Sequence, residues 1–192
     1  LPVRYLSWLG GLLSGDMGIS LQYSKPVSAL IFERLPVTAW LAGLALVFIL
    51  LLSFPAGVLS AKSSRSFLGR LLDSLTVLNL ALPNFFIGIL CIWVLGLVLH
   101  IFTPGAYVDY RQNFQGFLRY LIFPALAIAL PNAAVIAKFL RTSILAEKNS
   151  GYVATAKSKG LSDNAILLKH VLKNALIPAI TLFGMIIAEV FS

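Results

Sequence analysis

The chain has 192 residues, of which 59% are hydrophobic and only 11% are charged. A water-soluble domain usually carries about a quarter charged residues, so this composition excludes a soluble enzyme and indicates a protein that faces lipid. The formal net charge is +8, but the cations lie in short stretches between apolar runs, which favours anionic membrane lipid and an acidic protein partner over nucleic acid.

Residues 1–34 precede the first long apolar run and contain turn-forming residues, among them Gly15, Gly18 and Pro26. We expect turns and short interfacial pieces here, and we interpret these residues as an extracytoplasmic (periplasmic) segment. The chain begins with Leu1 rather than Met and ends at Ser192 directly after an apolar run. We therefore expect both ends to be cut.

Four later runs are long enough to cross a membrane, because a spanning helix needs about 20 mostly apolar residues. They cover residues 37–59, 75–99, 118–137 and a stretch from 175 to beyond 187. The third run holds Pro124 and Pro131, which predict a kink, and neighbouring helices must cover the carbonyls that lose their donors. The sequence thus predicts an all-α membrane protein, a polytopic bundle of transmembrane helices.

The connections between these runs differ in charge. Residues 60–73 hold three Lys or Arg and residues 138–174 hold seven, whereas Arg111 is the clear loop cation of residues 100–117. Connections rich in Lys and Arg stay in the cytoplasm. The first and third connections are therefore predicted inside and the second outside.

The search for catalytic groups is mostly negative. There is no phosphate-binding loop of the G-x-x-x-x-G-K-[ST] type, and His100 and His170 have no companions at ligand spacing. Cys91 has no partner cysteine, which excludes a disulfide framework and a cysteine metal site. We expect no catalytic residue, metal site or cofactor in this chain. Glu189 is the charged residue that falls within a predicted span, and its position allows either a functional or an interfacial role.

The third connection, residues 138–174, is called the basic loop below. Gly151 to Lys159 can form a short helix ended by Gly160, since glycine suits the left-handed position after a helix. Within it, Tyr152, Ala156 and Lys159 are expected on one face.

A second helix is expected to follow in the basic loop. Ser162 can cap a helix from Asp163 towards Lys173, and Asn174 and Pro178 then lead into the fourth span. Helical spacing would place Ala165, Leu168 and Leu172 on one side of this helix. The basic loop is thus predicted to form a helix-turn-helix unit on the cytoplasmic side. The alternative is an amphipathic helix that lies on anionic lipid.

These residues resemble a known family. Tyr152-Val-Ala-Thr-Ala-Lys-Ser-Lys-Gly160-Leu, followed by His170-Val-Leu-Lys-Asn174-Ala-Leu-Ile-Pro178, resembles the cytoplasmic "EAA" loop of ABC importer permeases, in their dipeptide, oligopeptide and nickel branch. Further similar segments are Gly15-Asp16-Met17-Gly18-Ile19-Ser20, Pro26-Val27, Leu35-Pro36-Val37-Thr38 and Pro83-Asn84-Phe85. This branch, like this chain with Thr155, lacks the glutamate of the loop's name.

The resemblance implies a fold and a domain organisation. Residues 35–192 would form an ABC transporter type-1 transmembrane domain, truncated at its C-terminal end, with the coupling loop at residues 138–174. Members of the family resemble six-span proteins with a first helix before residue 1 and a further segment and last helix at the other end. The chain would therefore hold about four of six spans.

The resemblance also implies a function. The chain would be a permease subunit of an ATP-driven importer that forms half of the pathway for dipeptides or oligopeptides, with a nickel or nickel-chelate importer as the alternative. Its partners would be a second homologous permease, two ATP-binding cassette subunits that hold ATP and Mg, and an extracytoplasmic substrate-binding protein. Its location would be the plasma (inner) membrane of a bacterium or archaeon.

The resemblance assigns roles to residues of the basic loop. The ATPase contact would be made by Tyr152, Thr155, Ala156, Lys157, Lys159 and Gly160, and the loop would be supported by His170, Asn174 and Pro178. Without the resemblance, the residues are also compatible with two other classes of membrane protein. A passive channel subunit would leave the basic loop unexplained, and a membrane-embedded enzyme would need clustered polar groups within the spans.

Overall fold

The computed structural model describes residues 2–191, which form two compact units that divide between Trp40 and Leu41. Apart from one isolated bridge between Ile19 and Pro26, the regular structure of the described residues is helical. The elements are α1 (Pro2–Leu13), α2 (Val27–Lys62), α3 (Phe67–Ala81), α4 (Asn84–Cys91), the π-helix η1 (Ile92–Val98), α5 (Phe114–Glu147), α6 (Gly151–Ser158), α7 (Asp163–Ile166), the π-helix η2 (Leu167–Val171) and α8 (Leu172–Val190). The predicted all-α fold class is confirmed.

The first unit contains the helix α1 and a turn-rich connection to α2. Gly15 and Gly18 have φ angles of +90° and +75°, which favour glycine. Between them, the Asp16 carboxylate accepts a hydrogen bond of 2.9 Å from the Gly18 N–H. The prediction of turns is confirmed for this connection, while residues 2–13 form a regular helix.

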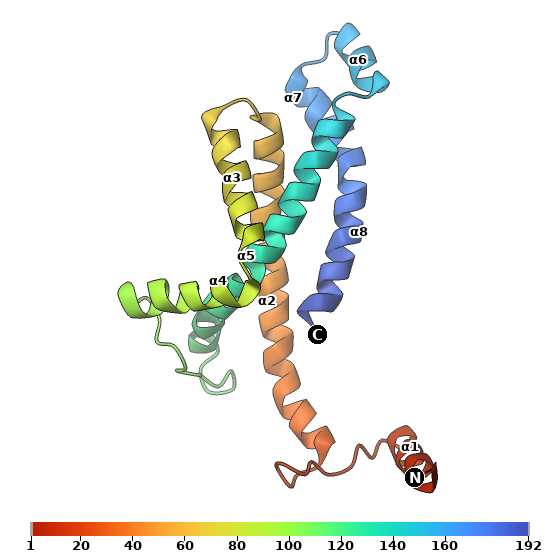
Figure 1. Cartoon of the computed structure of the whole chain (residues 1–192), viewed down its shortest axis with the longest axis vertical. Helices are drawn as coiled ribbons and strands as arrows, with labels where there is room; N and C mark the ends of the chain where they lie inside the picture. The colour runs from red at the N-terminus through yellow and green to blue at the C-terminus, as the bar shows by residue number, and fades with distance from the viewer. Residues whose placement is uncertain (1, 192) are drawn as a thin grey trace. The chain divides into compact units, whose positions relative to one another are not determined.

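Among the described residues, three helical stretches are long and apolar enough to cross a membrane: Val27–Lys62, Phe114–Glu147 and Asp163–Val190. They contain the first, third and fourth predicted spans, and each begins before the predicted start. In α5 the helix continues past Lys138 and Arg141, so the first ten residues of the basic loop are helical. Figure 1 shows α5 and α8 side by side, with α6 and α7 at one end of the pair.

The second predicted span is not a continuous helix. The chain bends by 112° between α3 and the segment Phe85–Val98, which forms a broken span or a re-entrant loop. The cause lies at Leu82 and Pro83: Leu82 is extended, with ψ 136°, and Pro83 has no N–H to continue the helix. The predicted span over residues 75–99 is therefore interrupted by a proline break that the apolar run conceals.

Small residues let α5 pack closely against its neighbours in the second unit. A stripe at every fourth position of α5 is buried: Ala125, Ala129, Ala133 and Ala137. On α2, a Cβ added to Gly57 would lie 3.0 Å from the carbonyl oxygen of Ala137. Such close backbone approach is typical of helix packing in membranes.

An ion-pair cluster joins α3 to α5. The Asp73 carboxylate lies 3.1 Å from Lys138 Nζ and 3.4 Å from Arg141 Nε. The three side chains are 20–36% exposed, so solvent screens them only in part. The cluster joins the middle of α3 to the part of α5 where the basic loop begins.

The connection between η1 and α5 packs aromatic rings onto the start of α5. Phe102 stacks on Phe123 with ring centroids 4.3 Å apart, and Tyr107 lies edge-on to Tyr120 at 5.8 Å. Asn113 then caps α5 by accepting a hydrogen bond of 2.8 Å from the Gly116 N–H. These contacts fix the end of α5 that is remote from the basic loop.

Candidate functional site

The first helix of the basic loop forms as predicted. Helix α6 spans Gly151–Ser158, and the chain leaves it at Gly160, whose φ of +77° is left-handed. Only glycine adopts this conformation without a steric penalty. The predicted role of Gly160 as a helix stop is therefore confirmed.

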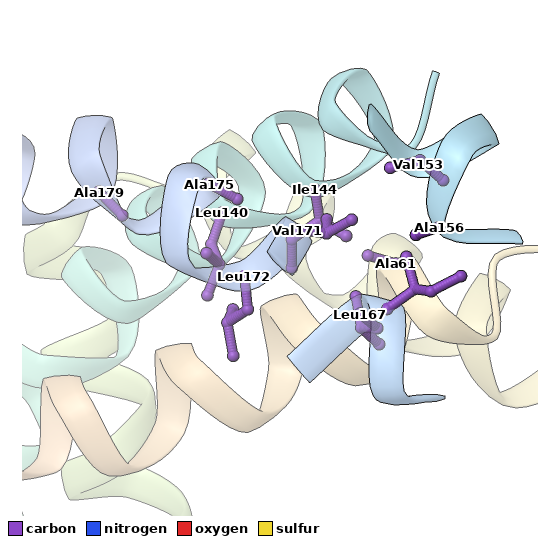
Figure 2. Packing of buried hydrophobic residues seen from close by; sticks show 11 residues of the cluster. Ala61, Leu140, Ile144, Val153, Ala156, Leu167, Val171, Leu172, Ala175 and Ala179 are labelled. Atoms are coloured by element: carbon purple, nitrogen blue, oxygen red, sulfur yellow. The ribbon is translucent and has the colours of Figure 1, made fainter. Parts of the chain in front are cut away.

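One face of α6 packs into the core of its own chain. Val153 and Ala156 are 4% and 8% exposed. They belong to a cluster that draws residues from α2, α5, α6, α7, η2 and α8: Ala61, Leu140, Ile144, Val153, Ala156, Ile166, Leu167, Val171, Leu172, Ala175 and Ala179. Figure 2 shows this packing, with Val153 and Ala156 beside Ala61 and Leu167. Ala156 thus contributes to packing, and its predicted part in a partner contact stays a prediction.

The opposite face of α6 is open. Thr155, Lys157, Lys159 and Gly160 are all exposed. Lys157 Nζ lies 3.3 Å from an Asp163 carboxylate oxygen, but the two side chains are 58% and 86% exposed, so this pair stabilises the loop little. Four of the six predicted contact residues are therefore accessible, and we call these four residues the outer face of α6.

Tyr152 connects α6 to the end of α5. Its hydroxyl donates a hydrogen bond of 2.6 Å to Glu147 Oε2, and the side chain is half-buried. Tyr152 also packs against the buried cluster that contains Ala156, whereas Lys159, predicted on the same face, is exposed. The contact of Glu147 is not predictable from the sequence, where its only signal is a carboxylate five residues before a tyrosine.

Lys148 connects the end of α5 to the end of α2. Its ammonium donates a hydrogen bond of 3.0 Å to the carbonyl oxygen of Ala61, one of the last carbonyls of α2. Burial lowers the pKa of Lys148, and repulsion from Lys157 lowers it further, while Asp163 acts in the opposite direction. A cation at a helix C-terminus stabilises carbonyls that lack helical donors. This contact was also missed, because it joins residues that are 87 positions apart.

The second helix of the basic loop continues directly into α8. The Ser162 hydroxyl caps α7 by accepting a hydrogen bond of 3.3 Å from the Ala165 N–H, as predicted. The three residues predicted on one side of this helix differ in exposure: Leu172 is buried, Ala165 is half-buried and Leu168 is 61% exposed. In the π-helix η2, Leu167 and Val171 are the buried residues.

The three predicted supporting residues lie along this continuous helix. His170, Asn174 and Pro178 are spaced by four residues and are all exposed, with Pro178 inside α8. They form a surface stripe and do not belong to the buried cluster. Their supporting role stays a prediction. Within the described residues, no group of three or more His, Cys, Asp or Glu side chains could hold a metal ion.

Comparisons with known proteins agree with this architecture. A family model described as "binding-protein-dependent transport system inner membrane component" matches residues 53–192. The chain is 38% identical over 188 residues to the oligopeptide transport system permease protein AppB of Bacillus subtilis, an alignment that covers 96% of this chain and 60% of that protein. It is 32% identical to the dipeptide transport system permease protein DppB of Lactococcus lactis, over 94% of this chain and 57% of that protein.

A putative peptide permease protein of Brucella suis is 34% identical over 96% of this chain and 59% of its own length. The chain therefore spans about three fifths of the length of the curated relatives it matches. The resemblance noted in the basic loop is confirmed, and it extends over the bundle as well. Since the family model covers most of the chain, the chain belongs to the family of binding-protein-dependent transport system inner membrane components.

Proposed function

We propose that this chain is part of the permease subunit of an ATP-driven ABC importer in the plasma membrane of a bacterium or archaeon. The family and the names of its relatives support a transport role, and three of those relatives are named as oligopeptide, dipeptide or peptide permeases. Peptides are therefore the proposed cargo, with a nickel complex as the alternative. Transport rather than catalysis is the proposed activity of the chain.

The basic loop is the proposed contact with a separate ATPase subunit. Its outer face offers the cations Lys157 and Lys159 beside the small residues Thr155 and Gly160. A helix with small side chains can enter a cleft, and its cations can meet acidic groups on the rim. The proposed partner surface is therefore a groove with acidic edges.

The observation that carries the proposal is the packing beneath this face. Val153 and Ala156 hold α6 against Ala61 of α2, Ile144 of α5 and Val171 of η2. Packed interiors transmit displacement, because they resist compression. A push on α6 would therefore move α5 and α8 together, and closure of an ATPase pair could switch the pathway between inward-open and outward-open states.

Other partners follow from the same proposal. A second homologous permease would complete the pathway, and residues 1–34 would face an extracytoplasmic substrate-binding protein. ATP and Mg would be held by the ATPase subunits. This arrangement requires the basic loop to lie in the cytoplasm, as its seven cations predict.

A charge reversal on the outer face of α6 tests the proposal. In the full-length permease expressed with its partner subunits, Lys159→Glu should reduce co-purification of the ATPase and peptide uptake by at least about tenfold, since it replaces attraction by repulsion. Arg65→Glu is the matched control, because Arg65 is also exposed in a predicted cytoplasmic connection but lies outside the basic loop. Equal ATPase binding by both variants would contradict the proposed contact.

A further inference from the structure

A polar cavity lies among the apolar helices α3, α5 and α8. It has a volume of about 250 Å³, and its polar lining consists of Asn79 from α3, Asn132 from α5 and Glu189 from α8. A second hollow of about 410 Å³ shares Pro131, Asn132 and Glu189 with it. Glu189 and Asn132 therefore stand where two adjoining spaces meet. We call the space lined by Asn79, Asn132 and Glu189 the polar cavity.

Along α5, the polar cavity lies about 9 Å from the start of the basic loop at Lys138. Asn79 comes six residues after Asp73 in α3, and Asn132 comes six residues before Lys138 in α5, and Asp73 pairs with Lys138. At about 1.5 Å per residue, both asparagines lie about 9 Å from this ion pair along their helices. Glu189 lies 17 residues beyond the start of α8 at Leu172, about 25 Å along the helix.

Hydrogen bonds within the chain do not satisfy these polar groups. Asn79 Oδ1 is buried and has no hydrogen-bond partner among the described residues. Asn132 Nδ2 donates to the carbonyl oxygen of Ile128 at 2.9 Å, which fixes the side chain and uses one of its two N–H donors. A buried acceptor without a donor is costly and calls for a ligand or another partner.

Glu189 also lacks a partner within the part of the chain that the structure describes. Its side chain takes part in none of the ion pairs or hydrogen bonds there, and Lys138 and Arg141 are already paired with Asp73. A carboxylate inside a membrane span that faces a cavity marks a substrate or ion pathway more often than a packing role. The cavity thus combines one negative charge with amide oxygens.

We propose that the polar cavity binds the protonated N-terminal amine of a peptide in transit. This inference rests on the proposed function and names the part of the substrate that the permease recognises. An ammonium group carries three N–H donors, and the cavity offers three side chains with acceptor oxygens, one of them charged. The remaining walls are apolar, among them Met185 and Ile186, and can accept varied peptide side chains.

The same lining argues against a metal ion as the ligand. Neither hollow is lined by His or Cys. Nickel favours imidazole and other nitrogen ligands, whereas carboxylate and amide oxygens suit hard cations and ammonium groups. The polar cavity therefore favours the peptide over the nickel alternative.

Peptides that differ only in the terminal amine test this inference. The complete transporter with its binding protein is reconstituted in vesicles, and initial uptake of trialanine and N-acetyl-trialanine is measured at saturating concentrations. Glu189→Gln should lower the uptake ratio of trialanine to its acetylated form by about tenfold relative to wild type, because one charged hydrogen bond is lost. Selection by the binding protein is the same in both transporters and cancels in this comparison.

Two further variants keep the test decisive. Asn79→Leu should lower the same ratio by about threefold, since it removes a neutral acceptor. Thr181→Val is the matched control on α8, because Thr181 bonds to the Ile177 carbonyl at 3.2 Å and does not line the polar cavity; its ratio should equal that of wild type.

The outcomes separate this inference from the proposed function. If wild type imports trialanine with ATP but Glu189→Gln and Asn79→Leu leave the uptake ratio unchanged, the inference is overturned and the proposed function stands. If wild type imports neither peptide, the proposed function fails and the inference falls with it. A lower uptake ratio of trialanine to its acetylated form in both cavity variants, with an unchanged ratio in Thr181→Val, supports the inference.

Discussion

The basic loop and the polar cavity arrange their polar groups in opposite ways. In the basic loop, Lys157 and Lys159 face solvent while Val153 and Ala156 are buried. In the polar cavity, Asn79 and Glu189 line a partly open hollow between helices and have no partners among the described side chains. The first arrangement suits a rigid surface that contacts a partner protein. The second suits a binding site for a small polar ligand. Substitutions in the two regions should therefore change stability in opposite directions.

The largest expected effect comes from a charge in the core beneath α6. Ala156→Glu places a carboxylate among apolar side chains and should destabilise the basic loop by about 3 kcal/mol or more. Limited proteolysis of the purified full-length permease should show rapid cleavage near residues 150–160, together with loss of ATPase binding. The cause would be disrupted packing rather than a lost direct contact.

The neighbouring alanine supplies the matched control. Ala154 is exposed on the same helix, so Ala154→Glu should leave the loop resistant to protease. Cleavage at similar rates in the two variants would show that α6 is not packed as described.

A smaller effect of opposite sign is expected in the polar cavity. Asn79→Leu replaces a buried acceptor that has no donor among the described residues, and it should raise the stability of the full-length permease by about 1 kcal/mol. Thermal unfolding in detergent measures this change. Combined with the reduced uptake ratio, a gain in stability would show a group retained for function rather than for folding.

The contrary result is equally informative. A loss of stability on Asn79→Leu would mean that Asn79 has a structural partner in the folded transporter. The contrast between the two regions would then disappear.

Local signals in the sequence predicted the ends of the loop helices correctly. Gly160 and Ser162 act through their own backbone and their nearest neighbours in the sequence. Their roles can therefore be predicted without knowledge of the fold. The long apolar runs likewise predicted three spans, because the need to satisfy backbone groups in lipid leaves few alternatives.

Features that depend on backbone geometry or distant contacts were missed. Leu168, predicted on the same side as the buried Leu172, is exposed in the π-helix η2, and hydropathy does not report a π-helix. Pro83 broke the second span within an uninterrupted apolar run. In these two segments the sequence predicted an apolar helical stretch correctly but did not predict the geometry of its backbone.

The polar cavity was also beyond the sequence analysis. Glu189 can be singled out in the sequence because it is a charged residue within a predicted span. Asn79 and Asn132, by contrast, are isolated amides in different apolar runs, and no sequence spacing connects them. Only the packing of α3, α5 and α8 brings them to one space. The contacts of Glu147 and Lys148 escaped detection for the same reason.

The central claim is that the outer face of α6 contacts an ATPase, and photo-crosslinking tests it most directly. The full-length permease carries p-benzoylphenylalanine in place of exposed Thr155, or in place of Arg65 as the control, and is irradiated with its partner subunits present. We expect a crosslink to the ATPase subunit from position 155 and none from position 65. Crosslinks from position 155 to lipid alone would contradict the claim and identify α6 as an amphipathic helix on the membrane surface.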